Sequence, residues 1–133
     1  MEQIEFIRSG EQTIAILIQA TFEPDQTTFI TPNNYEQQVG FIVYPTEGRI
    51  TPHKHKIIDR HLMSTSETLI VRKGRLEVQL YDNDNDLIAE RTLIKGDILV
   101  LVSGGHGFEM LEDTILLEIK QGPYTGLAEK EHF

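Results

Sequence analysis

The sequence predicts an all-β protein built from antiparallel strands, in the form of a sandwich or a small barrel. About ten short apolar segments follow one another along the chain, separated by turn residues such as Gly, Pro, Asn and Asp. No stretch shows the apolar spacing of a helix over a useful length. The 133 residues fit one domain, residues 1–133, which can bury a core without disulfides.

The first third of the chain contains four short runs of β-branched and apolar residues that favour strands: 4–7, 13–19, 27–30 and 39–44. Turn residues at 9–11 join the first two runs into a predicted hairpin. Residues 50–55 are predicted to be extended, because Pro52 disfavours helix at the residue before it. Residues 56–66 show no clean alternation and are predicted to form a loop.

The rest of the chain contains five further runs that favour strands: 67–72, 75–82, 87–93, 98–102 and 114–120. The second of these alternates regularly, so Leu76, Val78 and Leu80 should face one way and the residues between them the other. The run at 98–102 is apolar on both faces, which is typical of a central strand. The tail at 122–133 is polar, and no element is predicted for it.

The chain is acidic, with 12 Lys and Arg against 21 Asp and Glu and a formal net charge of −9. Phosphate backbones and anionic lipids repel such a chain, so neither nucleic acid nor a membrane is an expected partner. The N-terminus lacks the basic patch and apolar core of a secretory signal, and no apolar run has the length of a membrane span. The sequence therefore predicts a soluble cytoplasmic protein that binds a small molecule.

The residues with chemical potential gather in two stretches. Cysteine is absent, which leaves imidazole, carboxylate and water as metal ligands. On an extended strand, His53 and His55 would point the same way with Cα atoms roughly 6.6 Å apart, so both rings could reach one ion. Glu67 begins the next predicted strand and supplies a charged ligand. His106 follows a two-glycine turn that can bend sharply, and it would close the site from another hairpin.

Both stretches resemble the sequence motifs of the cupin family, over roughly residues 38–121. The matching residues are Gly48, the His53-Lys54-His55 triplet, Glu67, Gly74, the Gly96-Asp97 pair and the Gly104-Gly105-His106 turn. The resemblance implies an antiparallel double-stranded β-helix, that is, a jelly-roll barrel, with extra N-terminal strands in residues 1–37. It also implies one divalent metal ion, Fe, Mn, Ni or Zn, held by His53, His55, Glu67 and His106.

Two features depart from the cupin pattern. The usual proline before the last turn is absent, and eleven residues, 56–66, separate the histidine pair from Glu67 where the family has a shorter gap. This loop brings Arg60 and His61 to the predicted barrel mouth, where binding residues tend to lie. His61 is the candidate catalytic residue as a proton carrier, or it could replace Glu67 or His55 as a ligand. The candidate substrate-binding residues are Arg60, Tyr44 and Lys120.

Three functions fit the predicted site. The first is a metalloenzyme, either an isomerase or epimerase-like enzyme or a dioxygenase, that acts on a small polar substrate. The second is metal-free acid–base isomerisation of a nucleotide sugar, and the third is a small-molecule-binding module without turnover. The runs PHKH at 52–55 and EIKQGPY at 118–124 resemble small cupins of bacterial polysaccharide and nucleotide-sugar biosynthesis, which favours a sugar-derived substrate. Residues 1–35 exceed a minimal barrel and predict a homodimer formed through a strand edge.

Overall fold

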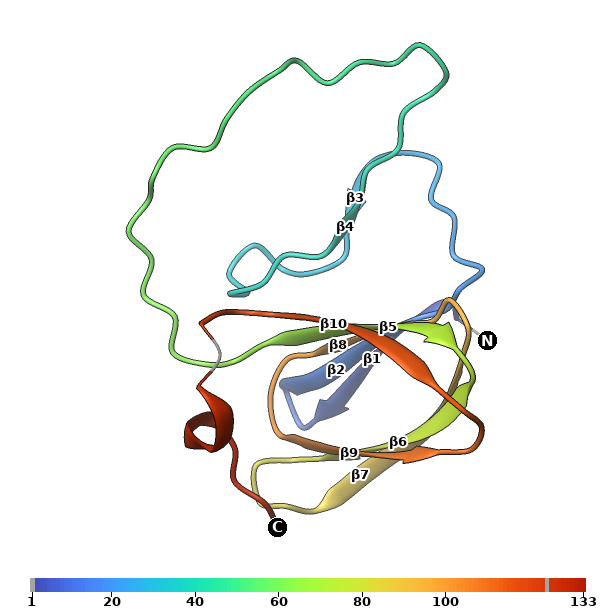
Figure 1. Cartoon of the computed structure of the whole chain (residues 1–133), viewed down its shortest axis with the longest axis vertical. Helices are drawn as coiled ribbons and strands as arrows, with labels where there is room; N and C mark the ends of the chain where they lie inside the picture. The colour runs from blue at the N-terminus through green and yellow to red at the C-terminus, as the bar shows by residue number, and fades with distance from the viewer. Residues whose placement is uncertain (1, 124) are drawn as a thin grey trace. The chain divides into compact units, whose positions relative to one another are not determined.

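The computed structural model describes residues 2–123 and 125–133, so Tyr124, the last residue of the EIKQGPY run, lies outside the described residues. The described residues form antiparallel strands and a 3-10 helix of four residues, which confirms the all-β prediction (Figure 1). Contacts group them into two compact units. Unit 1 comprises the chain up to Phe22 together with Thr65–Phe133, and unit 2 comprises Glu23–Ser64. Among the described residues, no helix has the length and apolar character needed to cross a membrane.

Unit 1 contains a five-stranded antiparallel sheet. Its strands, in spatial order, are β1 (Ile4–Ser9), β2 (Gln12–Ile18), β8 (Ile98–Leu101), β5 (Glu67–Lys73) and β10 (Ile115–Lys120). β1 and β2 pair as the predicted hairpin, with Ser9 opposite Gln12 across the turn. β8 lies between β2 and β5, which confirms the central position predicted from its apolar faces.

A three-stranded antiparallel sheet completes the strands of unit 1. Its order is β7 (Leu87–Ile94), β6 (Arg75–Tyr81) and β9 (Gly105–Met110). The chain alternates between the two sheets of this unit, because β5 and β8 belong to the first sheet while β6, β7 and β9 belong to the second. β6 is the central strand of the smaller sheet and pairs with β7 along one edge and with β9 along the other. In the pairing with β9, Leu80 lies opposite His106.

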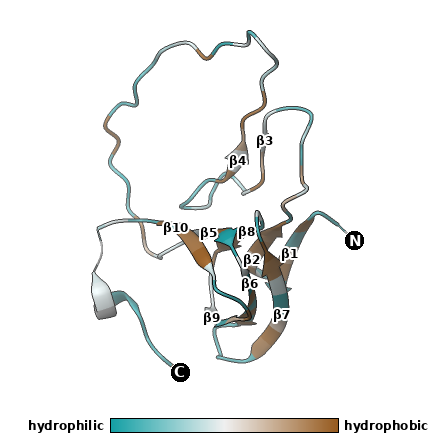
Figure 2. Ribbon diagram, turned by 45° about the vertical axis from the view of Figure 1, so that its right-hand side comes forward, coloured by the Kyte–Doolittle hydropathy of each residue, from teal (hydrophilic) through white to brown (hydrophobic). Residues whose placement is uncertain are grey.

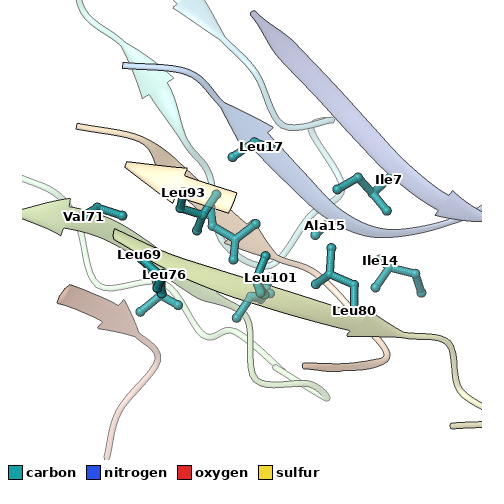
Figure 3. Packing of buried hydrophobic residues seen from close by; sticks show 12 residues of the cluster. Ile7, Ile14, Ala15, Leu17, Leu69, Val71, Leu76, Leu80, Leu93 and Leu101 are labelled. Atoms are coloured by element: carbon teal, nitrogen blue, oxygen red, sulfur yellow. The ribbon is translucent and has the colours of Figure 1, made fainter. Parts of the chain in front are cut away.

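The core of unit 1 lies between these two sheets. Leu76, Val78 and Leu80 of β6 are fully buried, as the alternation predicted. They pack in one apolar cluster with buried side chains of the larger sheet, among them Leu69 and Leu101 (Figure 3). Burying an aliphatic side chain of this size contributes about 1.5–3 kcal/mol, so this cluster is the main stabilising feature of the unit.

The strands of the described residues do not close into a barrel. Hydrogen bonds join them into three separate sheets, and β1, β10, β7 and β9 are edge strands of the two sheets in unit 1. The sequence predicts a strand at residues 39–44 and extended chain at residues 50–55. Of these residues only Gly40–Phe41 forms a strand, as β4, and residues 42–66 carry no strand. The pairing alone therefore supports an antiparallel all-β fold and leaves the jelly roll unproven.

Glycines in the left-handed region form the predicted turns. Gly74 has φ of 89° and joins β5 to β6, and Gly96 has φ of 92° and leads into β8. The second turn is held by Asp97, whose carboxylate accepts hydrogen bonds from the backbone N–H groups of Ala20 and Ile94, both at 2.9 Å. This buried carboxylate fixes the start of β8 against the end of β2.

Unit 2 is a short hairpin followed by a long irregular segment. β3 (Thr28–Phe29) pairs with β4, and Gly40 lies so close beneath the Phe29 ring that an added Cβ would be 2.6 Å from it. The Glu36 carboxylate accepts hydrogen bonds from the backbone N–H groups of Met63 and Ser64, at 2.9 and 3.1 Å. These bonds tie the end of the irregular segment to the region of the hairpin and lower the pKa of the Glu36 carboxyl.

Candidate functional site

Glu67 and His106 come together at one end of unit 1, although 38 positions separate them in the sequence. Glu67 opens β5 in the larger sheet, and His106 is the second residue of β9 in the smaller one. Their side chains are 15% and 32% exposed, and 4.0 Å separates Glu67 Oε2 from His106 Nε2. The structure therefore brings two of the four predicted ligands together from different sheets.

Strand alternation explains why these side chains meet between the sheets. Glu67 shares its face of β5 with the buried Leu69, and His106 shares its face of β9 with Phe108, which packs against the core. The His106 and Phe108 rings lie 5.6 Å apart. The site is thus the polar end of the same interior face that carries the apolar core.

Glu118 is a neighbour of this site that the sequence analysis did not select. It shares a face of β10 with Leu116, which packs against the core cluster, but the Glu118 side chain itself is exposed. Its carboxyl forms a hydrogen bond with Glu67. Lys120, on the same face, lies opposite Glu67 in the strand register. The signal that could have placed Glu118 was its parity with Leu116.

The surroundings of Glu67 favour its protonated form. Burial, and then the hydrogen bond and the charge of Glu118, raise the pKa of Glu67 to about 7, while Lys120 and Lys130 oppose the rise. Burial also lowers the pKa of His106, with a further lowering by Lys130 and an opposing effect of Glu118. Near neutral pH the pair is therefore a carboxyl group that exchanges a proton beside a neutral imidazole, and not a fixed ion pair.

Lys120, a candidate substrate-binding residue, is held by the C-terminal tail. Its Nζ lies 2.8 Å from Glu129 Oε1, and the two side chains are only 16% and 15% exposed. Glu129 lies in the 3-10 helix η1 (Gly126–Glu129) and also accepts a hydrogen bond from the Thr125 hydroxyl at 2.8 Å. The hydrogen bond with Glu129 raises the pKa of Lys120, so this residue brings a positive charge to the site.

His53 and His55 form the second pair, within unit 2. Their ring centroids are 5.2 Å apart, so the two rings are neighbours as predicted, although the segment is not a strand. His53 Nδ1 lies 2.8 Å from the Thr51 carbonyl oxygen and donates to it. That bond assigns the proton to Nδ1 and leaves Nε2 free to accept, which is the arrangement that a metal-binding imidazole requires.

The other predicted residues of unit 2 are exposed. His61 and Asp59 lie 3.8 Å apart with side chains 89% and 92% exposed, so Asp59 is a neighbour that sequence reasoning did not select. Arg60 is exposed as well, and Tyr44 is 52% exposed. Each of these side chains is open to solvent within its own unit.

Among residues 2–123 and 125–133, no three His, Asp or Glu side chains are grouped in a way that could hold a metal ion. The predicted ligands form two pairs instead, His53 with His55 in unit 2 and Glu67 with His106 in unit 1. The donor chemistry of both pairs suits a divalent ion, because each offers imidazole or carboxyl groups with accessible electron pairs.

A separate cavity of about 790 Å³ lies among β1, β2 and β7 of unit 1, and neither Glu67 nor His106 lines it. Three of the four charged residues that line it, Glu5, Arg91 and Asp97, already have partners. Arg91 donates to both Glu5 oxygens, at 3.0 and 2.7 Å, and Asp97 accepts the two backbone bonds of its turn. The cavity therefore offers apolar walls but few unsatisfied polar groups, and the chemistry lies at the Glu67–His106 end.

No protein-family model, curated protein or solved structure matches this chain. The resemblance to cupins therefore depends on the motif residues alone.

Proposed function

We propose that this protein is a metal-binding cupin whose His53, His55, Glu67 and His106 hold one divalent ion and act on a small polar, sugar-derived substrate. The observation that carries the proposal is the meeting of Glu67 and His106. One residue comes from each of the two cupin-like motifs, and their side chains approach to 4.0 Å on the interior faces of different sheets.

The strand order of unit 1 is consistent with the finer fold that this proposal needs. From β5 to β10 the chain passes back and forth between two sheets, with β6 and β7 consecutive in one, giving β8-β5-β10 in the larger sheet and β7-β6-β9 in the smaller. A jelly roll has this kind of alternation.

The chain's own residues have distinct parts in this proposal. A bound ion would supply Lewis acidity that polarises a substrate carbonyl. Glu67 must lose its proton to become a ligand, whereas His106 is already neutral. Lys120 supplies a positive charge for an anionic substrate group, and His61 on the exposed loop would carry a proton to or from the substrate.

Metal analysis of the tag-free chain tests the proposal. After loading with Fe²⁺, Mn²⁺, Ni²⁺ or Zn²⁺ and dialysis at about pH 7.5, the chain should retain one ion, and His53→Ala and His106→Ala should each lose at least about tenfold in affinity. His132→Ala is the matched control, because this histidine lies in the exposed tail and belongs to neither pair. Failure of the unaltered chain to retain any of these ions would reject the proposal, as would full retention by His106→Ala.

A second candidate is metal-free acid–base isomerisation of a nucleotide sugar. It is favoured by one observation, namely that Glu67 has a pKa of about 7, where a group can both take and return a proton at neutral pH. In this case the chelator-treated protein should incorporate solvent deuterium into a keto-sugar, and Glu67→Gln should abolish the exchange. Absence of exchange in the metal-free protein, with exchange after metal is restored, would select the first proposal.

We also propose that the chain forms a homodimer through the edge of the larger sheet. β1 is an edge strand of that sheet within the described residues, so its outer backbone groups are available for pairing with a second copy. Sedimentation equilibrium should give twice the chain mass. Arg8→Pro, which removes a donor from β1, should shift the equilibrium towards the monomer.

A further inference from the structure

The described part of the C-terminal tail returns along unit 1 after β10, as the red trace in Figure 1 shows. Among its described side chains, Glu129 and Phe133 attach it. Glu129 of η1 pairs with Lys120 at 2.8 Å, and the ring of Phe133 packs edge-on against Tyr81 with centroids 4.9 Å apart. Sequence reasoning predicted no element and no role for this polar segment.

These two attachments lie on either side of the Glu67–His106 pair. Lys120, the first attachment, is opposite Glu67 in the register of β10 and β5. Tyr81, the second, is opposite Gly105, the residue before His106. A Cβ added to Gly105 would be 2.7 Å from the Phe133 ring, so the ring lies directly on the backbone beside His106.

Lys130 lies between the two attachments in the sequence. Its positive charge acts on Glu67 and on His106, lowering the pKa of each. The segment 125–133 is therefore attached at Glu129 to a neighbour of Glu67 and at Phe133 to the backbone beside His106.

We propose that residues 125–133 form a strap across Glu67 and His106, which opens to admit a ligand and closes behind it. The attachment at Phe133 is weak enough to open, because it is an aromatic contact whose Phe133 is still 64% exposed. Segments that cover binding sites are generally drawn from such marginally held regions. The inference concerns access to the site and does not depend on a bound metal.

Modification of His106 by diethyl pyrocarbonate, located by peptide mass spectrometry, measures this access. Phe133→Ala and Glu129→Gln should each raise the His106 rate about fivefold, while the rate of His61 stays unchanged as an internal reference. Ile94→Ala is the matched control, because it removes an apolar side chain that is 54% exposed on β7, opposite Arg75 and not opposite Tyr81. Equal His106 and His61 rates in the unaltered chain, or no acceleration in either variant, would overturn the strap.

A conservative variant provides a second test that does not remove the aromatic contact. The chain has no tryptophan, so Phe133→Trp introduces a single fluorophore at the end of the strap. Iodide should quench its emission more strongly when Glu129→Gln is added, because loss of the Lys120 pair releases the segment. Identical quenching in the two proteins would show that the ion pair does not hold the strap, and the proposal would fail whether or not the metal site is confirmed.

Discussion

Glu67 changes its charge near neutral pH because the fold removes its carboxyl group from water and places Glu118 beside it. Its pKa of about 7 in the folded protein lies above the unfolded value of 4.5. The native state therefore binds more protons than the unfolded state between these values, and the stability of the metal-free protein falls as the pH rises through this window. Below the unfolded pKa both states are protonated, and the stabilising contribution of the proton is complete.

Glu67→Gln should remove the loss of stability that ionisation of Glu67 causes as the pH rises. In the presence of a chelator, we expect the variant to match the unaltered chain in melting temperature at about pH 5 and to exceed it at about pH 8, because Gln stays neutral. Differential scanning calorimetry at both pH values measures the difference. Glu109→Gln on β9 is the control for loss of an exposed carboxylate. A melting difference of the same size at both pH values would contradict the raised pKa.

At the residue scale, the sequence identified candidate metal-ligating side chains more reliably than it identified the residues that surround them. The motif spacing selected Glu67 and His106, and the structure brings them together. The same reasoning left open the side of β10 on which Glu118 and Lys120 lie. That choice depends on which strand pairs with β10, and hence on long-range contacts that local alternation does not contain.

At the scale of elements, β6 is the strand whose prediction rests on the clearest pattern. Leu76→Ala should lower the free energy of unfolding by about 2–5 kcal/mol, because it leaves a cavity in the fully buried cluster between the sheets. Ile94→Ala, at a side chain 54% exposed on β7, should change it by less than about 0.5 kcal/mol. Urea denaturation followed by circular dichroism gives both values. Similar costs for the two variants would mean that this cluster is not the core.

An ion pair also joins the two sheets of unit 1. Arg91 of β7 binds both carboxylate oxygens of Glu5 on β1, and this hydrogen bonding is the main cause of the lowered pKa of Glu5. Both side chains are more than a third exposed, so Glu5→Gln should cost only about 0.5–1 kcal/mol in urea denaturation. Glu112→Gln, which removes the more exposed partner of Arg75, should cost less. A larger loss at Glu112 would contradict the ranking by exposure and bidentate geometry.

Residues 39–44 and 50–55 show that a local sequence pattern does not contain the pairing on which a strand depends. Residues 39–44 and 50–55 have the composition of extended chain, and yet only Gly40–Phe41 pairs within unit 2. Pro45 and Pro52 carry no N–H group, which confines such segments to edges where pairing is incomplete. The predicted strands of unit 1 formed because each has a paired neighbour in a sheet that packs on the shared core, and β9 (Gly105–Met110), which was not predicted, formed for the same reason.

On the scale of the whole molecule, the chain leaves unit 1 after Phe22 and returns to it at Thr65. The intervening segment contains three of the five histidines. Near its end, the backbone N–H groups of Met63 and Ser64 donate hydrogen bonds to the Glu36 carboxylate. Apolar side chains remain exposed in both units, including Ile57 and Met63 in unit 2 and Ile115 and Leu117 on the apolar strand β10 of unit 1 (Figure 2). Their exposure fits a protein in which ligand or partner binding would bury further surface.

The proposed metal site makes a prediction for the molecule as a whole. An ion held by His53 and His55 of unit 2 and by Glu67 and His106 of unit 1 would restrain the intervening segment, which is exposed at Lys54, Lys56 and Arg60. Trypsin should therefore cut at these three residues at least about tenfold more slowly in the presence of saturating metal, since proteolysis follows the population of the open state. Mass spectrometry of the early fragments identifies each cut.

The ligand variants distinguish this restraint from a general effect of metal on the protease. His53→Ala and His106→Ala, each altering a different unit, should both lose the protection, whereas His132→Ala should keep it. Cleavage after Lys95, in the turn between β7 and β8, is the internal reference because it lies outside the restrained segment. Protection that survives in His106→Ala would place the ion in unit 2 alone, because His53 and His55 would then hold it without the residue from β9.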